Sequence, residues 1–129
     1  MAIARTKRWT QADSDRLQKK YDRETKKVVR ILKEAKPERI IRFGSATNGM
    51  LRPYSDLDLC VILPATAEHE KRHRARMKLF QLLRMRDYQH VLPIDIHIYY
   101  AEEFEDQLRR GYPLLAAIAR GETLYVGNR

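Results

Sequence analysis

The chain has 129 residues, 43% hydrophobic and 33% charged, a composition typical of a soluble globular protein with one modest core. No stretch approaches 18 apolar residues, which excludes a membrane-spanning helix, and the basic N-terminus lacks the apolar segment of a secretory signal. The single cysteine, Cys60, excludes both a disulfide framework and a thiolate zinc site, so we expect a cytoplasmic protein.

The formal net charge of +9 is concentrated toward the N-terminus, where residues 1–42 carry 14 Lys and Arg against 6 Asp and Glu. The positive charge of the whole chain lies mostly on two predicted helices, over residues 10–36 and 66–88. A field of this sign attracts phosphate-bearing ligands, whether nucleotides or nucleic acid. The alternative interpretation is an ordinary solvated helix face.

Helical and strand periodicities alternate along the chain. Apolar residues recur every three or four positions in some segments, whereas others are short β-branched runs. The expected elements are a helix over residues 10–36, a strand over 39–43, a turn with a short helix within 44–50, a strand over 57–63, a helix over 66–88, a strand over 93–100, helices over 101–111 and 112–121, and a closing strand over 122–126. Strands that alternate with helices predict an α/β (α+β) fold, a small mixed β-sheet flanked by helices.

Helix ends are marked by capping and breaking residues. Thr10 or Asp13 is expected to cap the first helix, and Pro37 follows its end. After the next strand, Gly44 allows a sharp bend and the close approach of a ligand to the backbone. We expect Ser45 to be the N-cap of the short helix, which would direct backbone N–H groups at an anion such as phosphate. The alternative is an ordinary strand-turn-helix junction.

Two acids lie one residue apart in an otherwise apolar run, "SDLDLCVIL". Side chains alternate along a strand, so Asp56 and Asp58 share one face, and their repulsion at about 6 to 7 Å is roughly 2 to 3 kcal/mol. The other face carries the residues expected to meet the core, Leu57, Leu59, Val61 and Leu63. Paired carboxylates suit hard cations such as Mg²⁺. The alternative is a strand end that emerges into solvent.

The strand "PIDIHIYY" adds another acid in an apolar setting. Asp95 and His97 share one face of this strand. If it lies beside the strand over residues 57–63, Asp95 joins Asp56 and Asp58 around two metal ions. Metal pairs about 3.5 to 4 Å apart clamp the attacking and leaving oxygens of a phosphoryl displacement.

Gly44-Ser45, ten further residues and then Asp56-Leu57-Asp58 resemble the signature of the DNA polymerase β-like nucleotidyltransferase superfamily. Because the chain is short, it most resembles the minimal nucleotidyltransferase branch. The resemblance covers about residues 38–126, including the ending "EEFE…LYV". It implies a single nucleotidyltransferase domain over residues 1–129, in which the basic helix over residues 10–36 precedes the core.

The resemblance also implies roles for individual residues. Asp56 and Asp58 would bind both of two Mg²⁺ ions, and Asp95 would bind the catalytic ion and help to activate the attacking hydroxyl. Gly44 and Ser45 would hold the β- and γ-phosphates of ATP or another nucleoside triphosphate.

One position departs from the family pattern. Asn48 stands where many relatives carry arginine. Two alternatives follow: either Arg52 or Arg42 supplies the basic contact to the triphosphate, or this contact is missing.

The function implied is transfer of AMP from ATP to a hydroxyl group, with release of pyrophosphate. So short a chain leaves no separate domain to recognise an acceptor, so the acceptor surface is expected on a partner. The resemblance implies a HEPN-type helical toxin as that partner and an antitoxin role in a toxin–antitoxin system, while a second copy of the chain is the alternative. Two competing hypotheses are a non-catalytic antitoxin that masks its partner by contact and a basic nucleic-acid-binding domain.

Three further residue sets have alternative interpretations. His69 and His73 have the spacing of two metal ligands on a helix, but no nearby acid or cysteine completes the set, so an exposed helix face is expected. His97 either contacts substrate or is structural. Cys60 is expected to be an inert buried thiol.

Overall fold

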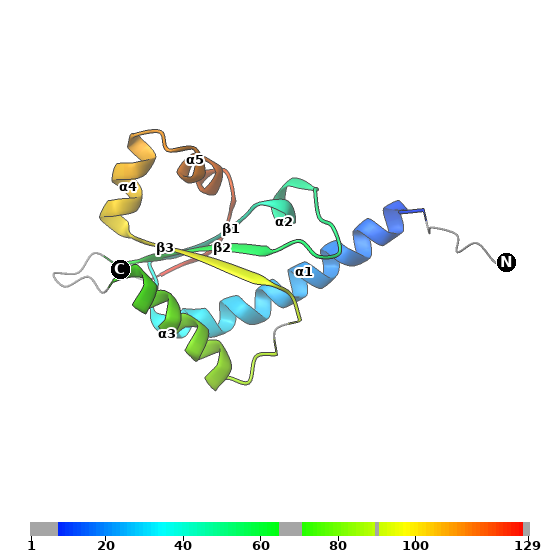
Figure 1. Ribbon diagram of the computed structural model, residues 1–129, viewed down its shortest axis with the longest axis horizontal. Coiled ribbons are helices and arrows are strands. Elements are labelled where there is room, and N and C mark those ends of the chain that lie inside the picture. The colour runs from blue at the N-terminus through cyan, green and yellow to red at the C-terminus, as the bar shows by residue number, and fades with distance from the viewer. Residues whose placement is uncertain (1–7, 65–70, 90, 128–129) are drawn as a thin grey trace.

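The structure is a computed structural model that describes residues 8–64, 71–89 and 91–127. Its elements follow the expected order (Figure 1). They are α1 (Gln11–Leu32), the 3₁₀ turn η1 (Lys33–Ala35), β1 (Arg39–Phe43), α2 (Ser45–Asn48), β2 (Leu57–Leu63), α3 (Arg72–Met85), β3 (Ile94–Tyr100), α4 (Ala101–Arg109), α5 (Pro113–Ala119) and β4 (Glu122–Val126). The expected first turn of the third helix, at residues 66–70, lies outside the described residues.

The start of α1 is fixed by both capping residues that the sequence suggests. The Asp13 N–H donates to the Thr10 hydroxyl, and the Asp13 carboxylate accepts from the Thr10 N–H, which forms a capping box. At the other end, Lys36 adopts a left-handed conformation with φ 55° and ends the 3₁₀ turn just before Pro37. The long helix therefore begins and ends where local chemistry dictates.

The four strands form one mixed sheet in the order β3-β2-β1-β4. β1 pairs antiparallel with β2 and with β4, whereas β2 and β3 run parallel. The parallel register places Asp58 opposite Asp95. The strands over residues 57–63 and 93–100 thus lie side by side, which confirms the condition on which the meeting of these two acids depends.

Helices cover both faces of the sheet. α1 and α3 pack on one face, and α4 and α5 pack on the other (Figure 1). The α1/α3 face holds the larger apolar core, which includes the inward residues of β2 (Leu57, Leu59 and Val61) as expected. The α4/α5 face holds the smaller core, in which Cys60 and Phe43 are buried. None of the helices in the described ranges is both long and apolar enough to cross a membrane.

A charged residue is buried on the α1/α3 face. Arg42 is 6% exposed, and its guanidinium donates to Asp22 at 2.8 Å and to Glu122 at 3.0 Å. It also donates to the Thr25 hydroxyl at 3.1 Å, while its Nε lacks a hydrogen-bond partner among the described residues. Arg42 therefore ties β1 to α1 and β4. It does not fit the expected contact to a triphosphate, because its guanidinium is engaged on the face opposite Asp58.

Candidate active site

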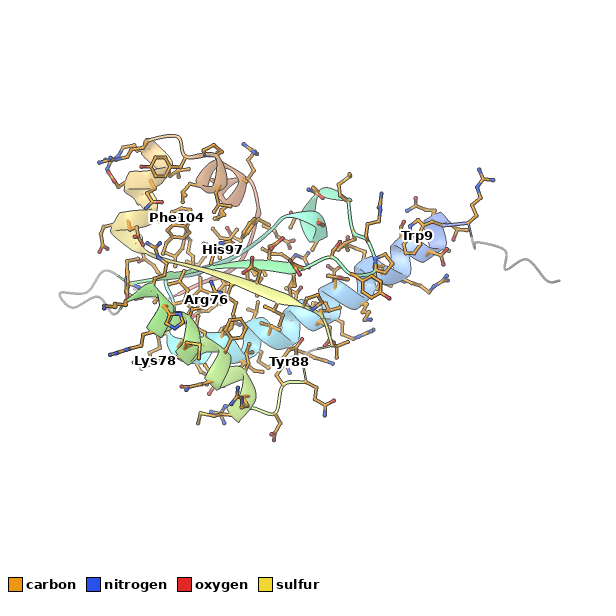
Figure 2. The ribbon with its side chains drawn as sticks, viewed as in Figure 1. Trp9, Arg76, Lys78, Tyr88, His97 and Phe104 are labelled. Carbon is orange, nitrogen blue, oxygen red and sulfur yellow. The ribbon has the colours of Figure 1, made fainter. Side chains whose placement is uncertain are left out.

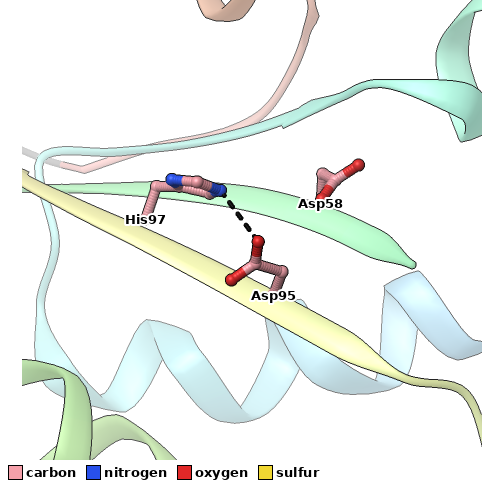
Figure 3. Close-up of side chains that lie close together, drawn as sticks. All are labelled: Asp58, Asp95 and His97. Carbon is pink, nitrogen blue, oxygen red and sulfur yellow. Dashed lines mark hydrogen bonds and ion pairs between the residues drawn. The ribbon is translucent and has the colours of Figure 1, made fainter. Parts of the chain in front are cut away.

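Two carboxylates and one imidazole meet on neighbouring strands. Asp58 projects from β2, and Asp95 and His97 project from β3 (Figure 3). One ligand atom from each of the three residues lies within 4.8 Å of the others. The parallel pairing produces this cluster, because opposed residues in neighbouring strands project to the same face of the sheet.

His97 contacts both Asp95 and the smaller core. Its Nε2 is 3.1 Å from Oδ2 of Asp95, and its ring packs edge-on against Phe43 with ring centroids 5.3 Å apart. The imidazole is thereby held in one orientation beside Asp95. The sequence alone did not decide whether His97 contacts substrate or has only a structural role. The structure places it in the same cluster as the acids.

The electrostatic setting of Asp58 is unfavourable for its charge. Burial, followed by the negative charges of Asp95 and Asp56, raises the pKa of Asp58 to about 6, while His97 acts in the opposite direction. A carboxylate with a raised pKa beside other carboxylates is stabilised by an added cation. The site therefore has an excess of negative charge that a divalent metal ion would neutralise.

Asp56 lies just outside this cluster. It is exposed and precedes the first residue of β2, and its ligand atoms are not part of the group formed by Asp58, Asp95 and His97. Its negative charge nevertheless acts on a buried tyrosine of α1. Together with burial, which is the larger cause, Asp56 raises the pKa of Tyr21, whose hydroxyl donates to the Ser55 carbonyl at 2.5 Å. Asp56 thus contributes to the negative potential at the end of β2.

Gly44 is in direct contact with the acidic cluster. Its φ of 78° and ψ of −152° are essentially restricted to glycine, and a Cβ there would lie 2.4 Å from Oδ2 of Asp58. The expectation that Ser45 caps α2 is wrong: Gly44 is the N-cap, and Ser45 is the first helical residue. The reason is the backbone turn at Gly44, whose carbonyl accepts from the Thr47 N–H at 3.0 Å and from its hydroxyl at 2.9 Å.

The loop between α2 and β2 holds the remaining polar candidates. Asn48 accepts a hydrogen bond from the Met50 N–H, which stabilises the turn after α2. Arg52 is exposed, and its guanidinium donates to the Leu51 carbonyl at 3.0 Å. Its side chain thus remains on the solvent side of the loop.

Two further candidates, His73 and Cys60, have the structural positions expected for residues without a catalytic role. His73 is exposed on α3, whereas His69 lies outside the described residues. Cys60 is fully buried two residues beyond Asp58, and burial raises the pKa of its thiol to about 12. A thiol with so high a pKa is not a nucleophile at neutral pH.

The cluster suits a hard divalent cation. Asp58 and Asp95 offer carboxylate oxygens, which are the ligands that Mg²⁺ prefers, and His97 adds a nitrogen that also suits transition metals. Burial and the neighbouring carboxylates, which raise the pKa of Asp58, make its charged form less favourable until a cation is added. The residues present therefore fit a bound metal ion.

Comparison with known proteins agrees with this chemistry. The family model described as nucleotidyltransferase domain matches residues 25–126, a span that begins within α1 and includes Gly44 and the three acids Asp56, Asp58 and Asp95. No match was found among curated proteins or among solved structures.

Proposed function

The chain belongs to the nucleotidyltransferase domain family of the polymerase β-like superfamily, and on this premise we propose that it transfers AMP from ATP to a hydroxyl group on a partner protein. The family's activity is nucleotidyl transfer, which takes a nucleoside triphosphate as substrate and a divalent metal as cofactor. The proposal specifies the nucleotide, the metal and the acceptor.

One observation carries the proposal. Asp58 and Asp95 face each other across parallel strands, and the pKa of Asp58 is raised by burial and by neighbouring negative charge. A fold gains no stability from two opposed carboxylates without a cation between them. The presence of both acids, with Asp58 against Gly44, is explained if the missing positive charge arrives with the substrate as Mg²⁺.

Asp56, Asp58 and Asp95 would hold two Mg²⁺ ions. When bound, such ions neutralise charge on the attacking and leaving oxygens of an in-line displacement. His97 positions Asp95 through the 3.1 Å contact between Nε2 and Oδ2. Asp56, which is exposed at the start of β2, completes the set from the solvent side.

The nucleotide would lie against the corner formed by β1 and α2. Gly44 exposes backbone there next to Asp58, because it has no side chain to block a phosphate. Ser45 follows with a hydroxyl donor, and Arg52 provides an exposed positive charge from the adjoining loop. These residues would bind the β- and γ-phosphates.

The chemical step conserves atoms and charge. The acceptor oxygen forms a bond to the α-phosphorus of ATP, and the bond from that phosphorus to the oxygen bridging to the β-phosphate breaks. Pyrophosphate leaves, and the acceptor proton passes to the Asp95 carboxylate. Asp95 is 43% exposed, which leaves it accessible to an incoming hydroxyl.

A protein acceptor is supported by the charge of the helices. α1 and α3 carry many exposed Lys and Arg side chains on the same face of the sheet, which suits an acidic partner. The resemblance to minimal nucleotidyltransferases points to a tyrosine on a HEPN-type toxin. We therefore infer an antitoxin role by modification of that toxin.

The test is intact-mass spectrometry of a purified HEPN-type protein, after incubation with the chain, ATP and Mg²⁺. Mass additions that match AMP should appear with the wild type and disappear with Asp58→Asn or with EDTA. Parallel reactions with GTP, CTP and UTP identify the preferred nucleotide. A partner that remains unmodified but is silenced by stoichiometric binding would instead establish the non-catalytic antitoxin hypothesis.

A further inference from the structure

A cationic pocket lies beside the proposed site, at the outer edge of β3. Its volume is about 270 Å³, and it is lined by side chains of α3 and by residues of β3 that include His97. We propose that this pocket binds an acidic side chain of the acceptor protein and so directs the acceptor hydroxyl toward Asp95. The inference rests on the proposed function, and it adds the side of approach and the chemistry of the acceptor segment.

The position of the pocket follows from the strand order. β3 is the edge strand beside β2, and β1 lies on the other side of β2. Gly44, at the end of β1, approaches Asp58 from the β1 side, whereas His97 contacts Asp95 on the β3 side and also lines the pocket. A nucleotide held at Gly44 leaves the β3 side open, so the second substrate would approach there.

The charge of the pocket is positive. Arg72, His73 and Arg76 line it from the first turns of α3, and among the residues that the structure describes no acidic side chain lines it. Arg72 is already engaged, because it forms an ion pair with Glu103 and stacks over the Tyr99 ring at 5.2 Å. Arg76 is exposed and has no ion-pair partner in the ranges that the structure describes (Figure 2). Its guanidinium is thus available to an incoming anion.

The surroundings of the pocket favour a carboxylate over a pairing strand or a nucleobase. Ile96 and Ile98 line it but are 0% and 1% exposed, so the backbone of these two residues is not open to an added strand. Tyr99 is covered by the Arg72 guanidinium, which removes the aromatic surface on which a base would stack. What remains is a planar guanidinium that binds a carboxylate through two parallel hydrogen bonds.

The direct test is binding of short peptides, measured by fluorescence anisotropy in the presence of Mg²⁺. One fluorescein-labelled peptide has a tyrosine flanked by glutamates, and its control has glutamines instead. The wild type should bind the acidic peptide at least about tenfold more tightly than the control. Arg76→Glu should remove that preference. Arg74→Glu, which makes the same charge change on the same helix outside the pocket, should retain it.

Each other outcome overturns the inference. Equal weakening by both variants would show that only the general field of α3 attracts the peptide. A wild type that binds both peptides equally, or neither, would rule out acidic recognition. A single-stranded RNA of the same charge that binds more tightly than the peptide and depends on Arg76 would assign the pocket to nucleic acid. Circular dichroism spectra of the variants exclude unfolding as a cause.

A second readout separates this inference from the proposed function. Transfer of AMP to the same peptides is followed by mass spectrometry with the wild type. Selective binding at Arg76 without transfer to peptide or partner would contradict the function but support the pocket. If Arg76→Glu does not change the transfer of AMP to the partner protein, the proposed function is supported and the proposed role of the pocket is overturned.

Discussion

Arg42 on the α1/α3 face of the sheet and Asp58 on the α4/α5 face are both withdrawn from solvent, but their neighbours differ. Arg42 is surrounded by opposite charge, with Asp22 at 2.8 Å and Glu122 at 3.0 Å. Asp58 is surrounded mainly by like charge, from Asp95 and Asp56. The same sheet therefore carries one charge cluster that the fold compensates and one that it does not.

This difference separates a structural cluster from a functional one. A buried charge with internal partners can hold elements together without any ligand, although its desolvation limits the gain. A carboxylate whose neighbours raise its pKa destabilises the ligand-free fold, and such groups concentrate at functional sites. The two clusters should therefore respond in opposite ways to substitution and to pH.

The largest effect is expected from Asp58→Asn. Loss of a central metal ligand should lower the rate of nucleotidyl transfer on the order of 10³-fold. The metal-free variant should melt at the same or a higher temperature, because the substitution removes repulsion from Asp95. Asp15→Asn, at an exposed position on α1, is the control for both measurements and should change neither. Turnover at the wild-type rate in Asp58→Asn would end the metal-site interpretation.

Gly44→Ala deforms the acidic cluster without changing its charge. We expect a loss of unfolding free energy on the order of 3 kcal/mol in urea denaturation, because φ 78° is strained and the new Cβ meets Asp58 at 2.4 Å. Gly49→Ala is a matched control, since Gly49 has φ 76° but no neighbour within 4 Å. It should lose only about 1 kcal/mol.

The contact with Asp58 can be isolated by a double-mutant cycle. Gly44→Ala should be less destabilising in an Asp58→Ala background, because the overlapping carboxylate is then absent. If the two glycine variants lose equal stability, and the cycle shows no coupling, the close packing of Gly44 on Asp58 is refuted.

Arg42→Met tests the compensated cluster. It leaves two carboxylates without their partner, but both are about half exposed, so the expected loss is about 2 kcal/mol, less than for a fully buried pair. Transfer per folded molecule should change less than twofold, because Arg42 lies on the opposite face from Asp58. Arg109→Met, which breaks an exposed pair with Asp106, should lose at most about 0.5 kcal/mol. If Arg42→Met selectively lost affinity for ATP, Arg42 would contact the triphosphate after all, contrary to its position in the structure.

The smallest effect is a pH dependence of stability in EDTA. The folded pKa of Asp58, about 6, lies above the ordinary value of 3.8, so the folded chain binds more protons than the unfolded chain between these values. The contribution of Asp58 to the free energy of unfolding is therefore greatest at low pH and falls as the pH rises through 6. After solvent screening, the difference between pH 4 and pH 8 should be on the order of 1 kcal/mol.

The measurement is the unfolding free energy of the wild type minus that of Asp58→Asn, at intervals from pH 4 to pH 8. Subtraction removes the contributions of titrating groups that do not interact with Asp58. The difference should decline with rising pH and level off above pH 7. A difference that is constant, or that increases with pH, would contradict the unfavourable setting of Asp58.

Much of this arrangement can be predicted from sequence, because it depends on local geometry. Alternation along a strand places Asp58 opposite in direction to Leu57 and Leu59, whatever the rest of the chain does. The capping chemistry of Thr10 and Asp13 fixes the start of α1 within one turn. For the same reason the order of helices and strands follows directly from the alternating periodicities.

The environment of each side chain, by contrast, depends on contacts between distant segments. Alternation predicts that Arg42 and Phe43 project to opposite faces, but only the packing of α1 and β4 decides that Arg42 meets Asp22 and Glu122. His97 joins the acids because β3 is parallel to β2 in one particular register. The left-handed turn that makes Gly44 the cap of α2, in place of Ser45, brings its backbone against Asp58. Periodicity fixes the direction in which a side chain projects, whereas the free energy of packing distant elements decides what it meets.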